Sequence, residues 1–342
     1  MAAGRKKYCE RILKMTASTE EFMKKSPRTY PSGEKNLKKV LNVLEQTFKA
    51  SSPRIAEREE QAFHKLLEFV GSFPKGRETL EELSKLNYTF RFENMPDQAG
   101  ACVYEDREIL LNPRSSLQTL SHIFVHEARH ALQHDAFGER RIQDYRAADF
   151  YKYMRGTEAD AYAHEAAFLY DMKDRCPALF DHWRKVPVYG AYADEMDRSG
   201  DERRAMEGSF QAFYSYAPYR EYYDGVYGDL VPALFKEAGR LKSKDYFRKT
   251  LSSEETAAVF RLNGKPYIAP AFFESPEAFA LPETDRRRIS AAAAEYARTV
   301  PGVTEDRSVE AMHSRRPDGS VLPRKTTATA PSLLSRKTQR EV

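Results

Sequence analysis

Cysteine is scarce in this sequence, and the few cysteines form no pattern. Cys9, Cys102 and Cys176 lie far apart and make no CxxC pair. An odd, scattered set argues against a disulfide framework and against a cysteine-based zinc site. We therefore expect free thiols in a reducing compartment.

A long apolar run is also missing. No segment approaches the ~20 apolar residues that a membrane helix needs. The basic start MAAGRKKYCERILKM is not followed by the apolar core of a signal peptide. These absences predict a cytoplasmic protein without a membrane partner, with export by a leaderless route as the alternative.

Charge of one sign is not in excess. The 342 residues include 55 Lys+Arg and 51 Asp+Glu, which gives a formal net charge of +4. This balance is too even to indicate nucleic acid as a partner. Hydrophobic residues at 41% and charged residues at 31% instead fit a soluble globular protein.

A short β-rich stretch stands between segments with helical spacing of apolar residues. Residues 88–92 (YTFRF) alternate as a half-buried strand does. Residues 100–104 and 108–111 flank a polar turn and predict a hairpin. The sequence therefore predicts a small sheet ahead of the helix that follows.

That helix is expected from about Ser116 to Phe137. Ser115 or Ser116 can cap its first turn, and Gly138 is placed to end it. Apolar residues at helical spacing give it one buried side.

An HExxH sequence, His126-Glu127-Ala128-Arg129-His130, lies inside this helix. Residues four apart lie on one face of a helix, so both histidines can bind one Zn²⁺ at ~2.0–2.1 Å. The neighbouring carboxylate can take the proton of a zinc-bound water without being a ligand. The pattern predicts His126 and His130 as metal ligands and Glu127 as the catalytic base.

A catalytic zinc site usually has a third protein ligand. His134 continues the series but lies roughly 12 Å along the helix axis from His126, which is too far for one ion. A metzincin would have Gly and His where this sequence has Gln133 and Ala136. The third ligand is therefore expected on another element.

The next long helix, expected over 157–173, offers several candidates. Glu158 is favoured because the small residues Ala159 and Ala161 beside it allow a close approach to the first helix. Glu165 shares its face, but Phe168 one turn later would hold the helices apart. Glu158 is the predicted third ligand, and the alternatives are Glu165, Asp160 and His164.

Three runs together resemble metallopeptidase families of the gluzincin type found in bacteria. They are ILLNP at 109–113, VHEARHALQ at 125–133 and TEADA at 157–161, and the resemblance covers roughly residues 80–175. In gluzincins the third ligand is a Glu on the following helix, which matches Glu158. Thermolysin-like relatives have an Asp four residues later, where this sequence has Tyr162.

The resemblance implies a strand beside the active-site helix that can pair with an extended substrate. Residues 100–104 and 108–111 are both candidates. The tyrosines between 214 and 227 are candidate donors to a developing oxyanion.

We thus expect an α+β fold, mainly helical, with a small sheet before the active-site helix. The predicted regions are an N-terminal helical region (1–75), a zincin-like domain (76–235), a C-terminal helical region (236–302) and a disordered tail (303–342). The predicted function is zinc-dependent hydrolysis of peptide or protein substrates. The alternative is a zincin-fold binding or effector module with little or no peptidase activity.

Overall fold

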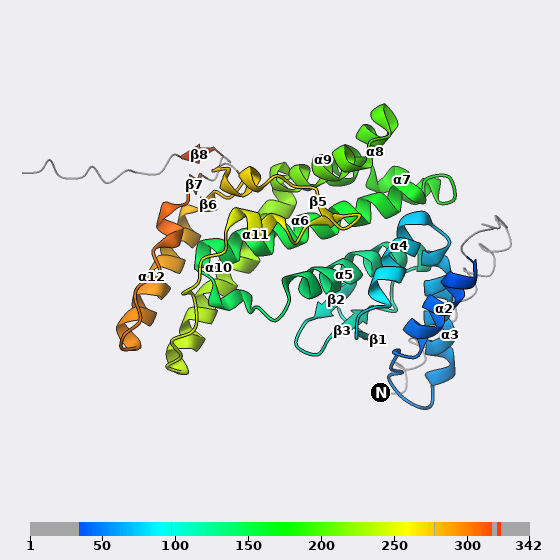
Figure 1. The fold of residues 1–342 in the computed structure, drawn as a ribbon, viewed down its shortest axis with the longest axis horizontal. Helices are drawn as coiled ribbons and strands as arrows, with labels where there is room; N and C mark the ends of the chain where they lie inside the picture. The colour runs from blue at the N-terminus through cyan, green and yellow to red at the C-terminus, as the bar shows by residue number, and fades with distance from the viewer. Residues whose placement is uncertain (1–33, 97, 277, 317–319, 323–342) are drawn as a thin grey trace, which may run out of the picture.

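The computed structural model describes residues 34–96, 98–276, 278–316 and 320–322 (Figure 1). The fold is α+β and mainly helical, as predicted, with three small sheets among these residues. No helix among them is both long and apolar enough to cross a membrane. The described part of the predicted N-terminal region contains α2 (Glu34–Glu45), α3 (Ala56–Gly71) and the start of α4 (Pro74–Leu83).

The first sheet has the order β1-β3-β2 and confirms the predicted hairpin. Strand β1 (Thr89–Phe92) is parallel to β3 (Glu108–Leu111), and β2 (Gly100–Val103) is antiparallel to β3. The ring of Phe90 in β1 lies 5.1 Å from that of Phe63 in α3 and 5.9 Å from that of Phe124 in α5. The sheet is thus fixed between these helices, with β2 at its edge.

Helix α5 (Leu117–Phe137) has the predicted bounds and caps. The side chain of Ser116 accepts a hydrogen bond from the backbone N–H of Thr119, which satisfies one free donor of the first turn. Gly138 follows the last residue with φ 73°, a conformation that glycine adopts without strain.

Helix α6 (Ala147–Asp171) begins ten residues before the helix expected over 157–173. Glu158 therefore lies in mid-helix and not in the first turn. Helix α6 packs along α5 near the centre of the molecule (Figure 1). Ala161 is buried and shares the face of Glu158 and Glu165, so its small side chain leaves room for α5.

The helices after α6 form the other half of the protein. They are α7 (Pro177–Trp183), α8 (Pro187–Ser199), α9 (Glu202–Ser215), α10 (Ala217–Arg240), α11 (Ser253–Ala257) and α12 (Glu283–Thr299). Helix α10 continues through the predicted boundary at 235/236 and packs against α12 (Figure 1). One hydrophobic core extends from Val40 to Met312, so the described residues show no break there. The other boundaries between the four predicted regions stay predictions.

The remaining elements are short. They are the 3-10 helices η1 (Ile142–Asp144), η2 (Pro270–Glu274) and η3 (Ser308–Ala311), and the strands β4 (Arg261–Leu262), β5 (Lys265–Pro266), β6 (Leu281–Pro282), β7 (Ser314–Arg315) and β8 (Val321–Leu322).

The prediction of a disordered tail over 303–342 was wrong for its first part. Asp306 accepts a hydrogen bond of 2.7 Å from the backbone N–H of Ala147, and Val309 is buried. Sequence reasoning missed these residues because isolated apolar and acidic residues give no periodic signal. Residues 317–319 and 323–342 lie outside the described part of the chain.

A buried ionic cluster connects this last segment to α6 and α10. The carboxylate of Asp224 in α10 accepts hydrogen bonds from Tyr151 and Arg155 of α6 and from Arg315 of β7. Arg155 is fully buried, and its guanidinium also lies over the ring of Phe213 at 5.3 Å. A buried charge is tolerated only when it is paired in this way.

The cluster predicts that Asp224→Ala is strongly destabilising. The substitution leaves two buried guanidinium groups without their counter-ion, which costs about 3–5 kcal/mol in the free energy of unfolding. Asp229→Ala is the matched control on the same helix, since its exposed ion pair with Arg288 contributes about 0–1 kcal/mol. Urea unfolding followed by circular dichroism measures both, and equal effects would contradict the role of the cluster.

Candidate functional site

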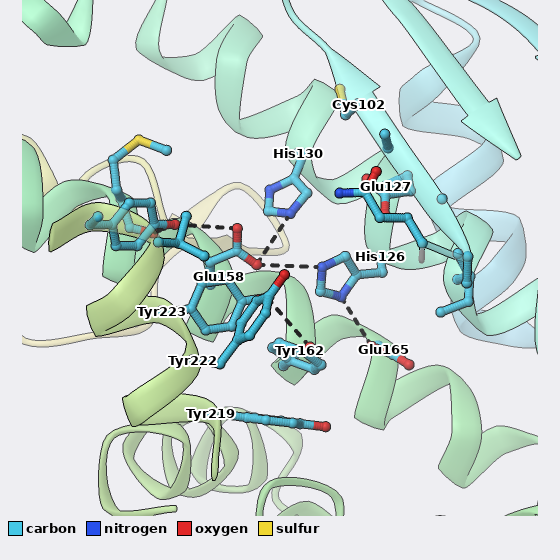
Figure 2. A pocket seen from close by; sticks show the side chains of 18 of the residues that line it. Cys102, His126, Glu127, His130, Glu158, Tyr162, Glu165, Tyr219, Tyr222 and Tyr223 are labelled. Atoms are coloured by element: carbon cyan, nitrogen blue, oxygen red, sulfur yellow. Dashed lines mark hydrogen bonds and ion pairs between the residues drawn. The ribbon is translucent and has the colours of Figure 1, made fainter. Parts of the chain in front are cut away.

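Helices α5 and α6 bring the predicted metal ligands together. The Nε2 atoms of His126 and His130 each lie 3.7 Å from the same oxygen, Oε2 of Glu158 (Figure 2). One ligand atom from each of the three side chains lies within 4.8 Å of the others, so the group could hold a metal ion. No other such group occurs among the described His, Cys, Asp and Glu residues.

The Nδ1 atom of each imidazole ring, on the side away from Glu158, has a hydrogen-bond partner. Nδ1 of His126 lies 3.0 Å from Oε2 of Glu165, whose other oxygen lies 2.6 Å from Nδ1 of His122. Burial alone would raise the pKa of Glu165, but the hydrogen bonds from the two histidines lower it, so it is an ionised acceptor. Nδ1 of His126 therefore donates to Glu165, and Nε2 faces Glu158 in the cleft.

His130 is oriented by an amide. Its Nδ1 lies 2.9 Å from Oε1 of Gln133, whose Nε2 donates to the carbonyl of Thr157 at 2.8 Å and to Asp160 at 2.6 Å. Because both of these partners are acceptors, the amide oxygen must face the imidazole. Nδ1 of His130 thus donates to this oxygen, and Nε2 points into the cleft.

Two of the alternative third ligands have other partners. Asp160 accepts hydrogen bonds from Arg129 at 2.5 Å and from Tyr267 at 2.8 Å, in addition to Gln133. His164 is buried, with Nε2 3.6 Å from Asp160, and burial lowers its pKa well below the usual value. Neither residue belongs to the group of possible metal ligands.

The carboxylates of the site titrate in opposite directions. Burial would raise the pKa of Glu158, but the charges and hydrogen bonds of His130 and His126 lower it well below its ordinary value. The pKa of Glu127 is raised, chiefly by burial and only partly offset by the two histidines. The carboxylate of Glu158 is thus ionised, and the carboxyl group of Glu127 has the higher pKa of the two.

Glu127 lies against β2. A Cβ atom at Gly100 would be 2.8 Å from Cγ of Glu127 and 2.7 Å from Cγ2 of Ile123, closer than side chains tolerate. The glycine is therefore required by close approach. Figure 2 shows Glu127 on the side of the strand and Glu158 on the opposite side of the two histidines.

These residues line a cleft of about 560 Å³. Its lining comes from β2, α5, α6 and α10, together with Trp183 of α7 and Tyr189 of α8. The walls are rich in aromatic rings: Tyr104, Tyr162, Trp183, Tyr189, Tyr219, Tyr222, Tyr223 and Tyr227.

The tyrosines expected near the site separate into two groups. Four of them, on α10, line the cleft: Tyr219, Tyr222, Tyr223 and Tyr227. Tyr214 is instead buried in the core between Phe210 and Phe272. The hydroxyl of Tyr227 donates to Oε1 of Glu158 at 3.4 Å, which helps to orient this carboxylate.

Sequence reasoning missed two partners of the histidines. His122 lies four residues before His126 and so shares its face, a spacing that could have revealed it. Gln133 was considered only as a departure from the metzincin pattern. Its position three residues after His130 is within reach on a helix.

The fold and the site define a mainly helical α+β protein with a buried His–His–Glu group that could hold a metal ion. Residues 38–254 match the model of a family described as a putative metallopeptidase family (DUF6782), and the chain belongs to this family. No curated protein and no solved structure matches the chain.

The geometry predicts different effects for the two glutamates of α6. Glu158→Ala removes a side chain that faces both Nε2 atoms, so zinc binding should be largely lost. Glu165→Gln removes only the charge behind His126, which weakens metal affinity by about 10–100-fold. Competition with a chromophoric chelator measures both affinities. Loss of zinc in Glu165→Gln together with retention in Glu158→Ala would reverse the assignment.

Proposed function

We propose that this protein is a zinc-dependent peptidase of the gluzincin type. In this proposal His126, His130 and Glu158 hold the zinc ion, and Glu127 is the general base that acts on peptide or protein substrates. The observation that carries the proposal is the convergence of two Nε2 atoms on one oxygen of Glu158 at 3.7 Å.

The donor set fits zinc. Tetrahedral zinc with bonds of ~2.0–2.1 Å separates neighbouring ligand atoms by about 3.3 Å. The two histidine nitrogens each lie 3.7 Å from Glu158, and all three ligand atoms lie within 4.8 Å of one another, so the group must contract to reach this value. Two neutral imidazoles and one carboxylate are a common ligand set for catalytic zinc, and they leave a position open towards the cleft.

Bound zinc would act as a Lewis acid that lowers the pKa of water and polarises the scissile carbonyl. Glu127 would accept a proton from the attacking water as the new C–O bond forms, and would then deliver this proton to the leaving nitrogen as the peptide C–N bond breaks. Burial raises the pKa of Glu127, which favours proton transfer. An intact carboxylate at this position also favours catalysis over the alternative of a binding module.

Of the two candidate substrate strands, β2 is the one at the sheet edge. Strand β3 is paired on both sides, whereas β2 has only β3 as a neighbour. Ala101 and Cys102 of β2 line the cleft beside Glu127. We propose that an extended substrate pairs with this edge through backbone hydrogen bonds.

Glu127→Gln tests the base. The amide cannot accept a proton, so we expect kcat to fall by about 10²–10⁴-fold while the zinc content stays at one ion per chain. Zinc content by atomic emission and cleavage of a mixed peptide library are the two measurements. Full activity of the zinc-loaded variant would exclude Glu127 as the base.

Gly100→Ala tests the position of the base. The added methyl group would displace Glu127 or Ile123, so kcat should fall about tenfold or more, since an ångström of misplacement is costly. Zinc affinity should be unchanged, because neither displaced side chain is a ligand. The control is Gly208→Ala in α9, where a Cβ would meet only one carbonyl oxygen, at 3.9 Å.

A further inference from the structure

The rim of the cleft has an exposed apolar stripe on α10. Among the described residues, five large apolar side chains are exposed: Val43, Tyr222, Val226, Leu230 and Leu241. Tyr222, Val226 and Leu230 follow one another at intervals of four and therefore share a helix face. All three line the cleft, with exposed fractions of 62%, 39% and 37%. Contiguous exposed apolar surface at a site usually marks contact with a ligand.

The wall of the cleft opposite the stripe presents polar backbone groups. Among the described residues β3 is the one strand that pairs with β2, so no strand of this part of the chain covers the N–H and C=O groups on the outer edge of β2. In Figure 2 the strand with Cys102 and the helix with Tyr222 lie on opposite sides of His126, His130 and Glu158. A chain between these walls would meet hydrogen-bonding groups on one side and apolar side chains on the other.

The charged side chains that line the cleft exclude recognition of the N-terminus or C-terminus of a substrate. No Lys or Arg occurs among the described residues that line it, so a substrate carboxylate has no cationic partner. Its three carboxylates are already engaged. Glu158 faces the two histidines, Glu165 bonds His122 and His126, and Glu127 has the role of base. None is left to bind a substrate ammonium group.

We propose that the cleft binds an internal, extended polypeptide segment with bulky apolar side chains, which pack on the Tyr222–Val226–Leu230 stripe while its backbone pairs with β2. The inference rests on the proposed function for the cleavage that follows binding. Binding itself needs only the two walls. The protein is then an endopeptidase whose preference is set by α10.

The test uses short peptides with acetylated and amidated ends, in pairs that differ by Leu or Ser at one position. Each fluorescein-labelled peptide is titrated with zinc-loaded Glu127→Gln protein, and the fluorescence anisotropy gives the Kd. We expect the best Leu peptide to bind about tenfold more tightly than its Ser partner. Wild-type protein should cleave the same Leu peptide with a correspondingly higher kcat/KM.

The stripe variant is Tyr222→Ser/Val226→Ser/Leu230→Ser in the same Glu127→Gln background. It should reduce the Leu/Ser preference about tenfold, since the apolar contact surface is removed. Leu241→Ser and Val43→Ser are matched controls outside the cleft, with exposed fractions of 52% and 39%, and should keep the preference. If the melting temperature of the triple variant falls, the single variant Tyr222→Ser is used in its place.

The outcomes separate this inference from the proposed function. Cleavage of blocked peptides without a Leu/Ser preference, or with the same preference in the stripe variant, overturns the inference and leaves the peptidase intact. A stripe-dependent binding preference without any cleavage by zinc-loaded wild type supports the inference and refutes the peptidase. A wild-type dimer that becomes monomeric in the stripe variant shows a self-association surface and also overturns the inference.

Discussion

Close packing of α5 against α6 is the constraint on which the site depends. The small side chain of Ala161, which is buried and shares the face of Glu158 and Glu165 on α6, lets the two helices approach. Polar groups enclosed at such a contact must find partners, because an unpaired buried charge is costly. Glu165 meets this requirement for His126, and Asp160 does so through Gln133. The same contacts that satisfy the buried groups therefore aim both imidazoles at one point.

The order of contacts along the two helices explains how the acidic residues of α6 acquire different roles. Glu158 faces His126 and His130, whereas Glu165 faces His122 and His126, so higher numbers on α6 meet lower numbers on α5. The helices are thus antiparallel, and the two glutamates approach His126 from opposite ring nitrogens. Sequence spacing alone gives both glutamates the same helix face, and only the relative position of the helices shows that Glu158 faces Nε2 and Glu165 faces Nδ1 of His126.

The sequence was sufficient for features with a local cause. The caps Ser116 and Gly138 bound α5, and residues 100–104 and 108–111 on either side of the polar turn form the hairpin. The family match supports a metallopeptidase, while the roles of individual site residues stay proposals. Contacts between distant segments were not predictable, since Asp306 and Arg315 sit in a polar stretch without periodicity. Their partners are set by the tertiary fold and not by their neighbours in sequence.

The buried cluster around Asp224 also sets an order of events during synthesis. Glu158 is made long before Arg315, and a ribosome adding ~5–20 residues per second needs roughly 8–30 s to cover the interval. Until then the carboxylate of Asp224 has only Tyr151 and Arg155 as partners. Because one hydrophobic core extends from Val40 to Met312, the His–His–Glu group and the α10 wall of the cleft are completed together, near the end of synthesis.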